Sequence, residues 1–392
     1  MQLRKTIFSC PSIFKRRVKI EPKQIIRRSL IKDPYFSVCI PQHNRTSFLI
    51  EACRSLSNQT FKNFEVCISD DCSTDGRQAE LLKFLEESSL SFVYRKQEQN
   101  RKYDVNLRSS IELAKGKFCF LLGNDDCLAS PTVFEELYNL IQEFKPIGVG
   151  ITNYKDYMTG KEFRRIRKTG ILGSGPEVAA TYFRNFSFVS GVLLNRNQSI
   201  QHATDRWDGS EMYQMYIACR MIAAGSTFLG IDRVLVRQGI QITGQQVNSY
   251  ASRPRLNPCP IIERRLPLNL LGRLVADAIS PHLEPSIAQK TFEKIFVQIF
   301  IFLHPYWLIE YRRIQSWKYA LGVCLGMRPR NVLHGIELEP FKKIRLAVLY
   351  FWMSLCGLAV PIKLFSLLRP IFNWVSRPSH WNPSKVYACD SN

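Results

Sequence analysis

The stretch Phe118-Cys119-Phe120-Leu121-Leu122-Gly123-Asn124-Asp125-Asp126 has five apolar residues followed directly by polar and acidic ones. An unbroken apolar run of this length predicts a strand buried on both faces, as in a parallel sheet. Such sheets bind ligands outside the carboxyl ends of their strands, which is where both carboxylates stand. Because Mg²⁺ and Mn²⁺ are often held by carboxylates together with substrate phosphates, the stretch indicates a metal-assisted phosphate site. The alternative is a strand that ends in an ordinary polar turn, since Asp favours turns.

Strand and helix patterns alternate on both sides of this stretch. Apolar runs predict strands at 36–40, 64–68 and 91–94, and amphipathic segments predict helices after Thr46 and over 76–87, 104–115 and 131–144. Weaker patterns predict strands at 147–151, 188–194 and 228–236, with a helix from Gly209-Ser210 to Ala224. This alternation is typical of an α/β domain with a largely parallel, mixed sheet.

The chain has 392 residues and a formal net charge of +21, and the excess of basic residues lies at its two ends. Residues 1–33 contain ten Lys and Arg against two acids, and residues 261–392 contain seventeen against eight. Such charge favours nucleic acid, an anionic membrane surface or a phosphorylated substrate as partner. The middle of the chain is nearly neutral and has no nucleic-acid-binding motif, so we expect no nucleic-acid partner.

We expect four segments. They are a basic N-terminal arm (1–34), an α/β domain (35–252), a Pro-rich linker (253–260) and a helical, basic, membrane-associated module (261–392). The twelve cysteines form no C-x-x-C pair, and basic residues interrupt the apolar residues of the first twenty positions. These features predict reduced thiols, no secretory signal and a cytosolic location.

The C-terminal module contains seventeen residues without a charge, 346–362, with basic residues on both sides. Seventeen residues are the lower limit for a membrane-spanning helix. Basic flanks at both ends favour a helix or hairpin that lies in the cytosolic interface over a single crossing. The alternative is an ordinary buried helix of an accessory domain.

Three segments now stand in order: Ser37-Val-Cys-Ile-Pro-Gln-His-Asn-Arg45, Phe64-Glu-Val-Cys-Ile-Ser-Asp-Asp-Cys-Ser-Thr-Asp-Gly76 and Phe120-Leu-Leu-Gly-Asn-Asp-Asp126. In residues and spacing they resemble the family 2 glycosyltransferases, among them enzymes of bacterial cell-surface polysaccharide and lipopolysaccharide assembly. The resemblance covers roughly residues 35 to 240. It implies the GT-A fold, a Rossmann-like nucleotide-diphospho-sugar transferase domain, here followed by a mainly helical C-terminal module.

The resemblance also implies a donor site. Its nucleotide-sugar-binding residues would be Pro41, His43, Asn44, Arg45, Asp70, Asp71, Asn106, Asn124 and Asp125, with Asp125 and Asp126 as ligands of a Mn²⁺ or Mg²⁺ ion. The alternative role of Asp70 and Asp71 is turn formation and helix capping. Gly123 stands where many relatives have the first acid of the metal motif, so weaker metal binding or loss of activity is a further alternative.

Sugar transfer needs a base that takes the proton of the acceptor hydroxyl. By resemblance this acid precedes a helix downstream, where Glu211 is the best match and Asp208 the second. The alternative is that Ser210 caps the helix and Glu211 complements its dipole. The expected function is an inverting, metal-dependent transfer to a saccharide or polyprenol-linked acceptor at the cytoplasmic face of the bacterial inner membrane. The alternative function is a catalytically impaired module that binds nucleotide sugar or scaffolds a membrane assembly.

Overall fold

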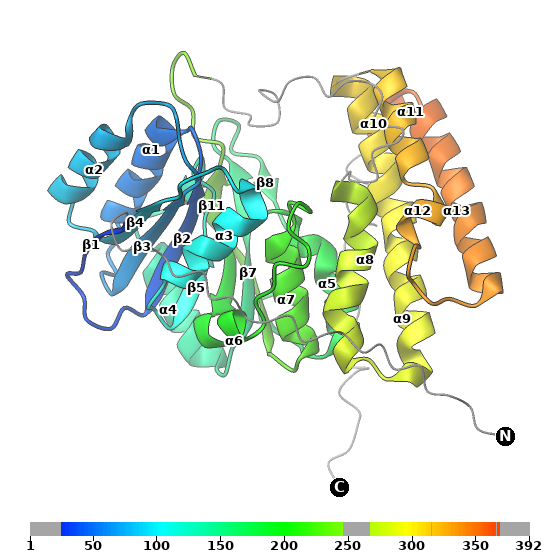
Figure 1. The fold of residues 1–392 in the computed structure, drawn as a ribbon, viewed down its shortest axis with the longest axis horizontal. Coiled ribbons are helices and arrows are strands. Elements are labelled where there is room, and N and C mark those ends of the chain that lie inside the picture. Colours follow the sequence, from blue (N-terminus) through cyan, green and yellow to red (C-terminus); the bar gives the residue numbers. More distant parts are fainter. Residues whose placement is uncertain (1–24, 246–266, 315, 366, 369–392) are drawn as a thin grey trace, which may run out of the picture.

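A computed structural model describes residues 25–245, 267–314, 316–365 and 367–368 of the chain. One mixed sheet forms the centre of the first part, and helices cover both of its faces (Figure 1). The strand order is β1-β4-β3-β2-β5-β10-β7-β11-β6, with β8 beside β7 and β9 beside β11. The strands are β1 (Ile25–Arg28), β2 (Phe36–Gln42), β3 (Phe64–Asp70), β4 (Ser91–Lys96), β5 (Phe118–Leu121), β6 (Cys127–Leu128), β7 (Val149–Asp156), β8 (Glu162–Phe163), β9 (Gly170–Gly173), β10 (Val192–Asn195) and β11 (Phe228–Gln238).

Strands β4, β3, β2 and β5 run parallel to one another. Nearly every residue of β2 and β3 is buried, which is why their sequences are mostly apolar rather than alternating. The two polar residues inside these runs satisfy each other, because the Ser37 hydroxyl donates to the Glu65 carboxylate at 2.7 Å. Gln42 pairs with Asp70 at the carboxyl ends, and β5 ends at Leu121 in the same part of the sheet. The predicted sheet with a polar carboxyl edge is confirmed.

Two hydrophobic cores flank the sheet. On one face Phe36, Val38 and Ile40 pack with residues of α1 (Thr46–Ser57), α2 (Gln78–Glu87) and α4 (Val133–Phe144). On the other face Cys39 and its neighbours pack with α3 (Lys102–Leu113), α5 (Pro176–Tyr182) and α7 (Tyr213–Ala223), and this second core continues into the C-terminal helices. A short helix, α6 (Arg196–Gln201), follows β10.

The C-terminal part is helical, as predicted. Its helices are α8 (Pro267–Ile279), η3 (Ser280–His282), α9 (Pro285–Gln298), η4 (Ile299–Leu303), α10 (His304–Ile314), α11 (Trp317–Gly326), α12 (Pro329–Val332) and α13 (Pro340–Ala359). Residues Pro285–Arg313 form one continuous helix of 29 residues that is long and apolar enough to cross a membrane. Phe296 and Phe300 of this helix are fully buried within the protein, so part of its apolar surface already packs internally.

Several boundaries differ from the sequence-based expectation. Residues 25–28 of the expected basic arm form β1, which pairs with β4 at the edge of the sheet. The expected strand 188–194 is limited to β10, and the helix expected from Gly209-Ser210 begins at Tyr213. The expected linker 253–260 lies outside the described residues.

Candidate functional site

Asp70 and Asp71 shape the loop that follows β3. Both oxygens of the buried Asp70 carboxylate accept hydrogen bonds, one from the Ser73 N–H at 2.8 Å and one from the Tyr94 hydroxyl at 2.6 Å. Asp71 accepts the N–H groups of Arg101 and Lys102 at 2.6 and 2.8 Å, just where α3 begins. Burial raises the pKa of Asp71, and these two N–H groups oppose the shift. Each side chain therefore has a structural task in addition to its expected place in the donor site.

The segment after β2 lies against this loop. The Nδ1 atom of His43 is 3.0 Å from the Asp71 carbonyl oxygen, and the Asn44 N–H donates to the Ser73 hydroxyl at 2.9 Å. Asn44 has a φ of 48°, a left-handed conformation that Asn adopts more readily than most residues. The first and second sequence motifs are therefore in direct contact. Pro41, the residue before Gln42, pairs with Ser69 at the end of the β2–β3 ladder.

Gln42 joins three predicted elements of the site. Its carbonyl oxygen accepts the Asn106 side-chain amide at 2.9 Å, and its own side-chain oxygen accepts the Asn124 amide at 2.6 Å. Gln42 is fully buried, and its hydrogen bonds fix the positions of both asparagines. Gln42 was not predicted as a site residue, because only the fold shows that its buried side chain reaches Asn124.

Asp125 and Arg45 form an ion pair across the site. The Arg45 Nη1 atom donates to Asp125 Oδ2 at 2.7 Å, and the guanidinium group lies over the Phe48 ring at 4.4 Å from its centroid. Burial raises the pKa of Asp125, and the Arg45 charge opposes the shift. The Asp125 carboxylate remains partly exposed, which leaves it accessible to a cation or a ligand.

Asp126 is buried behind Asp125. Its carboxylate accepts the Ser190 hydroxyl at 2.5 Å and the Gly239 N–H at 2.9 Å, and the Ser190 oxygen accepts the Gly123 N–H at 2.8 Å. Burial and the neighbouring negative charge of Asp125 raise the pKa of Asp126 to about 8. Asp126 thus ties the acidic loop, residues 123–126, to Ser190 and Gly239 in two other segments of the sheet domain.

Gly123 leaves no room for a side chain in this arrangement. A Cβ atom at this position would lie 2.9 Å from Asp126 Oδ2 and 3.3 Å from both Asp125 Oδ1 and the Ser190 hydroxyl oxygen. With Asp125 and Asp126 packed as they are, position 123 cannot carry an acidic side chain unless these carboxylates move.

Replacement of Asp126 by Asn should flatten the pH dependence of stability. Between about pH 4 and pH 8 the folded protein holds a proton that the unfolded chain has released, so stability falls as pH rises, by up to about 1.4 kcal/mol per pH unit. Asp126→Asn removes this titration. Urea unfolding at several pH values, without divalent cations, measures the slope. An unchanged slope would contradict the assignment, and Asp205→Asn, an exposed acid, is the control.

Helix α3 positions Asp208 and Glu211, the two acids predicted as candidates for the catalytic base. Asp208 forms a bidentate ion pair with Arg108, at 2.6 and 2.7 Å, and Arg108 also donates to the Thr204 carbonyl oxygen. Because both Asp208 oxygens already accept charged hydrogen bonds, this carboxylate is poorly suited to take a proton from an acceptor.

Glu211 lies in a tight loop in front of α7. Its φ is +59°, a conformation that costs roughly 1–3 kcal/mol for most residues and persists only when its surroundings enforce it. Asp104 of α3 does so: its carboxylate accepts the N–H groups of Gly209 and Glu211, both at 2.8 Å, and of Tyr213 at 3.0 Å. Met212 is the N-cap residue of α7, and Asp104 supplies an acceptor from another helix. The Ser210 hydroxyl, the alternative cap, accepts the Met212 N–H at 3.2 Å.

Helix α3 thus connects the two halves of the site. Its amino end is held by Asp71, Asn106 reaches the β2 segment, and Asp104 and Arg108, four residues apart on one face, hold the loop of Glu211. Asp104 and Arg108 were not selected from the sequence. The spacing of an acid and a base at i and i+4 is the only sequence signal, and it occurs on many exposed helices.

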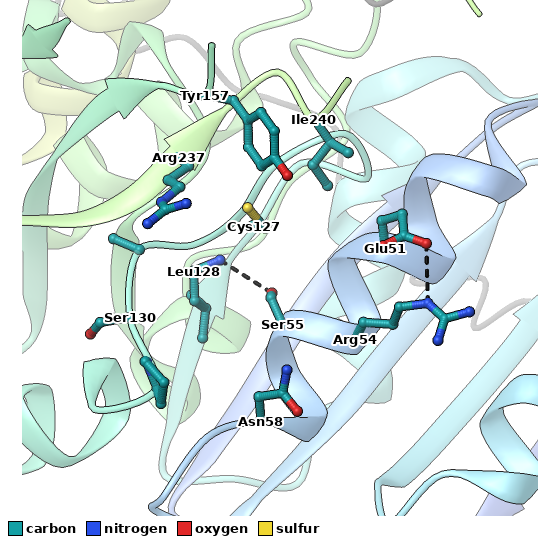
Figure 2. Close-up of a pocket in the computed structure, with 12 residues that line it drawn as sticks. Glu51, Arg54, Ser55, Asn58, Cys127, Leu128, Ser130, Tyr157, Arg237 and Ile240 are labelled. Atoms are coloured by element: carbon teal, nitrogen blue, oxygen red, sulfur yellow. Dashed lines mark hydrogen bonds and ion pairs between the residues drawn. The ribbon is translucent and has the colours of Figure 1, made fainter. Parts of the chain in front are cut away.

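A pocket of about 270 Å³ lies beside this site, between α1 and strands β6 and β11 (Figure 2). Arg54 of α1, Tyr157 and Arg237 are among its lining residues, and the Leu128 N–H donates to the Ser55 hydroxyl at its wall. None of the predicted site residues lines it. Two of its lining residues adjoin the acidic loop: Cys127 follows Asp126 directly, and the Ile240 N–H donates to the Asp125 carbonyl oxygen at 2.7 Å.

The family model and the curated relatives similar to this chain both point to glycosyltransferases. Residues 37–207 match the model of the family described as glycosyl transferase family 2. Abequosyltransferase RfbV of Salmonella typhimurium is 36% identical over 99 residues, which are 25% of this chain and 30% of that protein. The GalNAc(5)-diNAcBac-PP-undecaprenol beta-1,3-glucosyltransferase of Campylobacter jejuni is 30% identical over 97 residues, 25% of this chain and 31% of that protein. The matched part is thus about a third of the length of these relatives.

Solved structures share the fold over more of the chain. The S. aureus TarS structure (residues 1–349) in complex with UDP-GlcNAc has a TM-score of 0.56 at 14% identity and covers 86% of this chain and 91% of that one. At this identity the similarity concerns the fold. It extends beyond the sheet domain, because 86% of the chain is more than the segment from β1 to β11 contains.

Proposed function

Because residues 37–207 form a family 2 glycosyltransferase domain with the GT-A fold, we propose that the protein transfers a sugar from a nucleotide-sugar donor to a saccharide or lipid-linked acceptor. The observation that carries the proposal is the role of α3. One helix joins the Asp71 loop and the Gln42 segment, on the donor side, to the loop that carries Glu211.

The donor would lie at the carboxyl edge of β2, β3 and β5. His43, Asn44 and the Asp70–Asp71 loop would form the nucleotide part of the site, and Arg45 would reach the diphosphate next to Asp125. A guanidinium group suits phosphate because its N–H donors match phosphate oxygens in pairs.

The residues present fit a divalent cation through Asp125. The described residues contain no cluster of three His, Cys, Asp or Glu side chains, but one or two carboxylates suffice when a substrate supplies phosphate oxygens. Asp125 would hold the ion, and Asp126 would fix the loop through Ser190 and Gly239. A bound Mn²⁺ or Mg²⁺ would stabilise the negative charge that develops on the departing diphosphate.

Glu211 would accept the proton of the acceptor hydroxyl as its oxygen attacks the anomeric carbon. Attack from the face opposite the diphosphate, in one displacement, would invert the anomeric centre. The enforced backbone of Glu211 supports this role, because strained conformations are retained where function needs them. Arg108 would keep Asp208 away from the reaction.

The acceptor and location are part of the same proposal. The name of the C. jejuni relative states an undecaprenol-diphosphate-linked substrate, and this chain is strongly basic. We therefore place the protein peripherally at the cytoplasmic face of the bacterial inner membrane, with a polyprenol-linked acceptor in cell-surface polysaccharide synthesis.

A donor panel tests the function. Purified protein is incubated with UDP-, GDP- and dTDP-sugars with and without Mn²⁺, and thermal stabilisation and slow donor hydrolysis are measured. One class of donor should give both signals, and EDTA should remove the hydrolysis. Stabilisation without hydrolysis by any donor would favour the impaired binding module, for which Gly123 in place of an acid is the specific argument. No stabilisation at all would reject both.

A further inference from the structure

The outer face of α13 is an apolar surface without a partner among the described residues. Six large side chains on this face are exposed, from 48% for Leu355 to 74% for Phe341: Phe341, Ile344, Val348, Phe351, Trp352 and Leu355. Their spacing of three, four or seven residues places them along one side of the helix. Three further exposed leucines, at 364, 367 and 368, follow beyond the end of α13. Continuous apolar surfaces of this extent mark an interaction site.

The opposite face of α13 is fixed to the protein. Leu346 is fully buried, and the Ser354 hydroxyl lies 2.8 Å from His304 Nε2. Gly357 lies so close to α10 that a Cβ atom there would be 2.9 Å from Leu308 Cβ. Arg312 of α10 donates to the carbonyl oxygens of Gly357 and Val360, at 3.0 and 2.8 Å, and so holds the carboxyl end of the helix. α13 cannot turn its apolar face inward without breaking these contacts.

The uncharged part of α13 is too short to cross a bilayer. The uncharged run expected at 346–362 is not one helix, because α13 ends at Ala359. Its uncharged helical part, 346–359, is roughly 21 Å long, whereas the hydrocarbon core measures about 30 Å. In addition, one side of this segment packs on α10. Whatever covers the outer face must therefore lie alongside the helix.

The charges near the two ends of the apolar face decide between partners. Lys343 and Lys363 are exposed near these ends, whereas Lys342 and Arg345 are paired with Glu339 and Glu293. Residues 267–368 contain twelve Lys and Arg against six acids, of which Glu337 and Glu339 directly precede α13. A second copy of the chain would bring basic ends together in either orientation of the two helices, and these ends would repel each other. A surface that is apolar inside and anionic at its boundary is complementary to both features.

We propose that the outer face of α13 docks onto an anionic lipid bilayer, with the helix axis parallel to the membrane surface. The exposed aromatic side chains enter the boundary between headgroups and acyl chains, and Lys343 and Lys363 contact lipid phosphates. α13 lies on the side of the helical module away from the sheet, so docking leaves the carboxyl edge of the sheet uncovered (Figure 1). The outer face of α13 would thus be the surface by which the protein contacts the membrane. Only the biological purpose of this contact rests on the proposed function.

Vesicle binding of the full chain tests the proposal without donor or acceptor. Co-sedimentation is measured with vesicles of phosphatidylcholine alone and of phosphatidylcholine with phosphatidylglycerol. The wild type should bind the anionic vesicles, and Phe351→Ser/Trp352→Ser should lower binding at least tenfold. Lys343→Gln/Lys363→Gln should lower it several-fold and reduce its salt dependence. Met158→Ser, which removes an equally exposed apolar side chain from the sheet domain, is the matched control and should bind as the wild type does.

Three results would overturn the proposal. The first is unchanged vesicle binding by Phe351→Ser/Trp352→Ser. The second is equal loss in the Met158→Ser control. The third is a wild-type oligomer that this double variant dissociates, since that would assign the face to a contact between copies. Thermal unfolding verifies that the variants fold, which is expected because the changed side chains are exposed. Donor hydrolysis measured in parallel separates failure of docking from failure of the catalytic proposal.

Discussion

Glu211→Gln is expected to lower the turnover number by about 10²- to 10⁴-fold, the usual contribution of a positioned general base. The amide keeps the size of the side chain but cannot take the acceptor proton. Donor affinity should change little, because the contacts of the donor segments run through Gln42, Asp71 and Asp125 rather than through this loop. Steady-state transfer kinetics and donor titration measure the two quantities separately.

The control for this loss is Asp205→Asn, an exposed acid six residues earlier in the chain. A companion variant, Asp104→Asn, replaces the carboxylate that holds the loop by an uncharged amide and keeps the Glu211 side chain itself. Asp104→Asn should lower the turnover number less than Glu211→Gln does. Asp104→Glu should have less than full activity, because its longer side chain shifts the carboxylate oxygens that accept the N–H groups of the loop. Normal turnover by Glu211→Gln would rule out this residue as base and return attention to Asp208.

Asp125→Asn is expected to lower kcat/KM by about a hundredfold or more and to abolish its dependence on divalent cations. The substitution removes the accessible negative charge of the acidic loop and breaks the ion pair with Arg45. EDTA should therefore inhibit the wild type strongly and the variant hardly at all. Donor titration with and without Mn²⁺ should show the same difference in affinity.

The control for Asp125→Asn is Glu51→Gln, which removes an ion-paired carboxylate from the neighbouring helix α1. It should retain both activity and cation dependence. If Asp125→Asn keeps its response to Mn²⁺, the cation is held elsewhere. If the wild type transfers sugar equally well in EDTA, the metal part of the proposal fails while the glycosyltransferase part stands.

Much of the fold could be predicted because its signals are local. The buried runs of β2, β3 and β5 are mostly apolar, and polar residues follow each run at the same edge of the sheet. β1 could not be predicted in this way, since Ile25–Arg28 is short, half basic and exposed, and becomes a strand only because β4 offers an unpaired edge. The start of α7 at Tyr213 was also missed, because its cap comes from Asp104, more than one hundred residues earlier.

In the candidate site, too, residues with local sequence signals were predicted, and residues that depend on contacts between distant segments were not. The sequence motifs identified the residues around the carboxyl edge, and hydrogen bonds join His43, Asn106 and Asn124 there. Ser190 and Asp104 were not foreseen, although each holds an acid of the predicted site. Their importance depends on which loops meet in space, and a hydroxyl or carboxylate in an ordinary sequence context carries no sign of it.

Gly123 also limits how this chain can change. Introducing Asp there, to regain the acidic pattern of many relatives, would force the new side chain against Asp126 and the Ser190 hydroxyl. A smaller residue at position 190 would give space, but alone it would leave the Gly123 N–H and a carboxylate oxygen without their partner. Each single substitution is therefore expected to be harmful. Because the Asp126 carboxylate is the nearest obstacle to a side chain at position 123, an engineered route to the acidic motif has to move Asp126 as well.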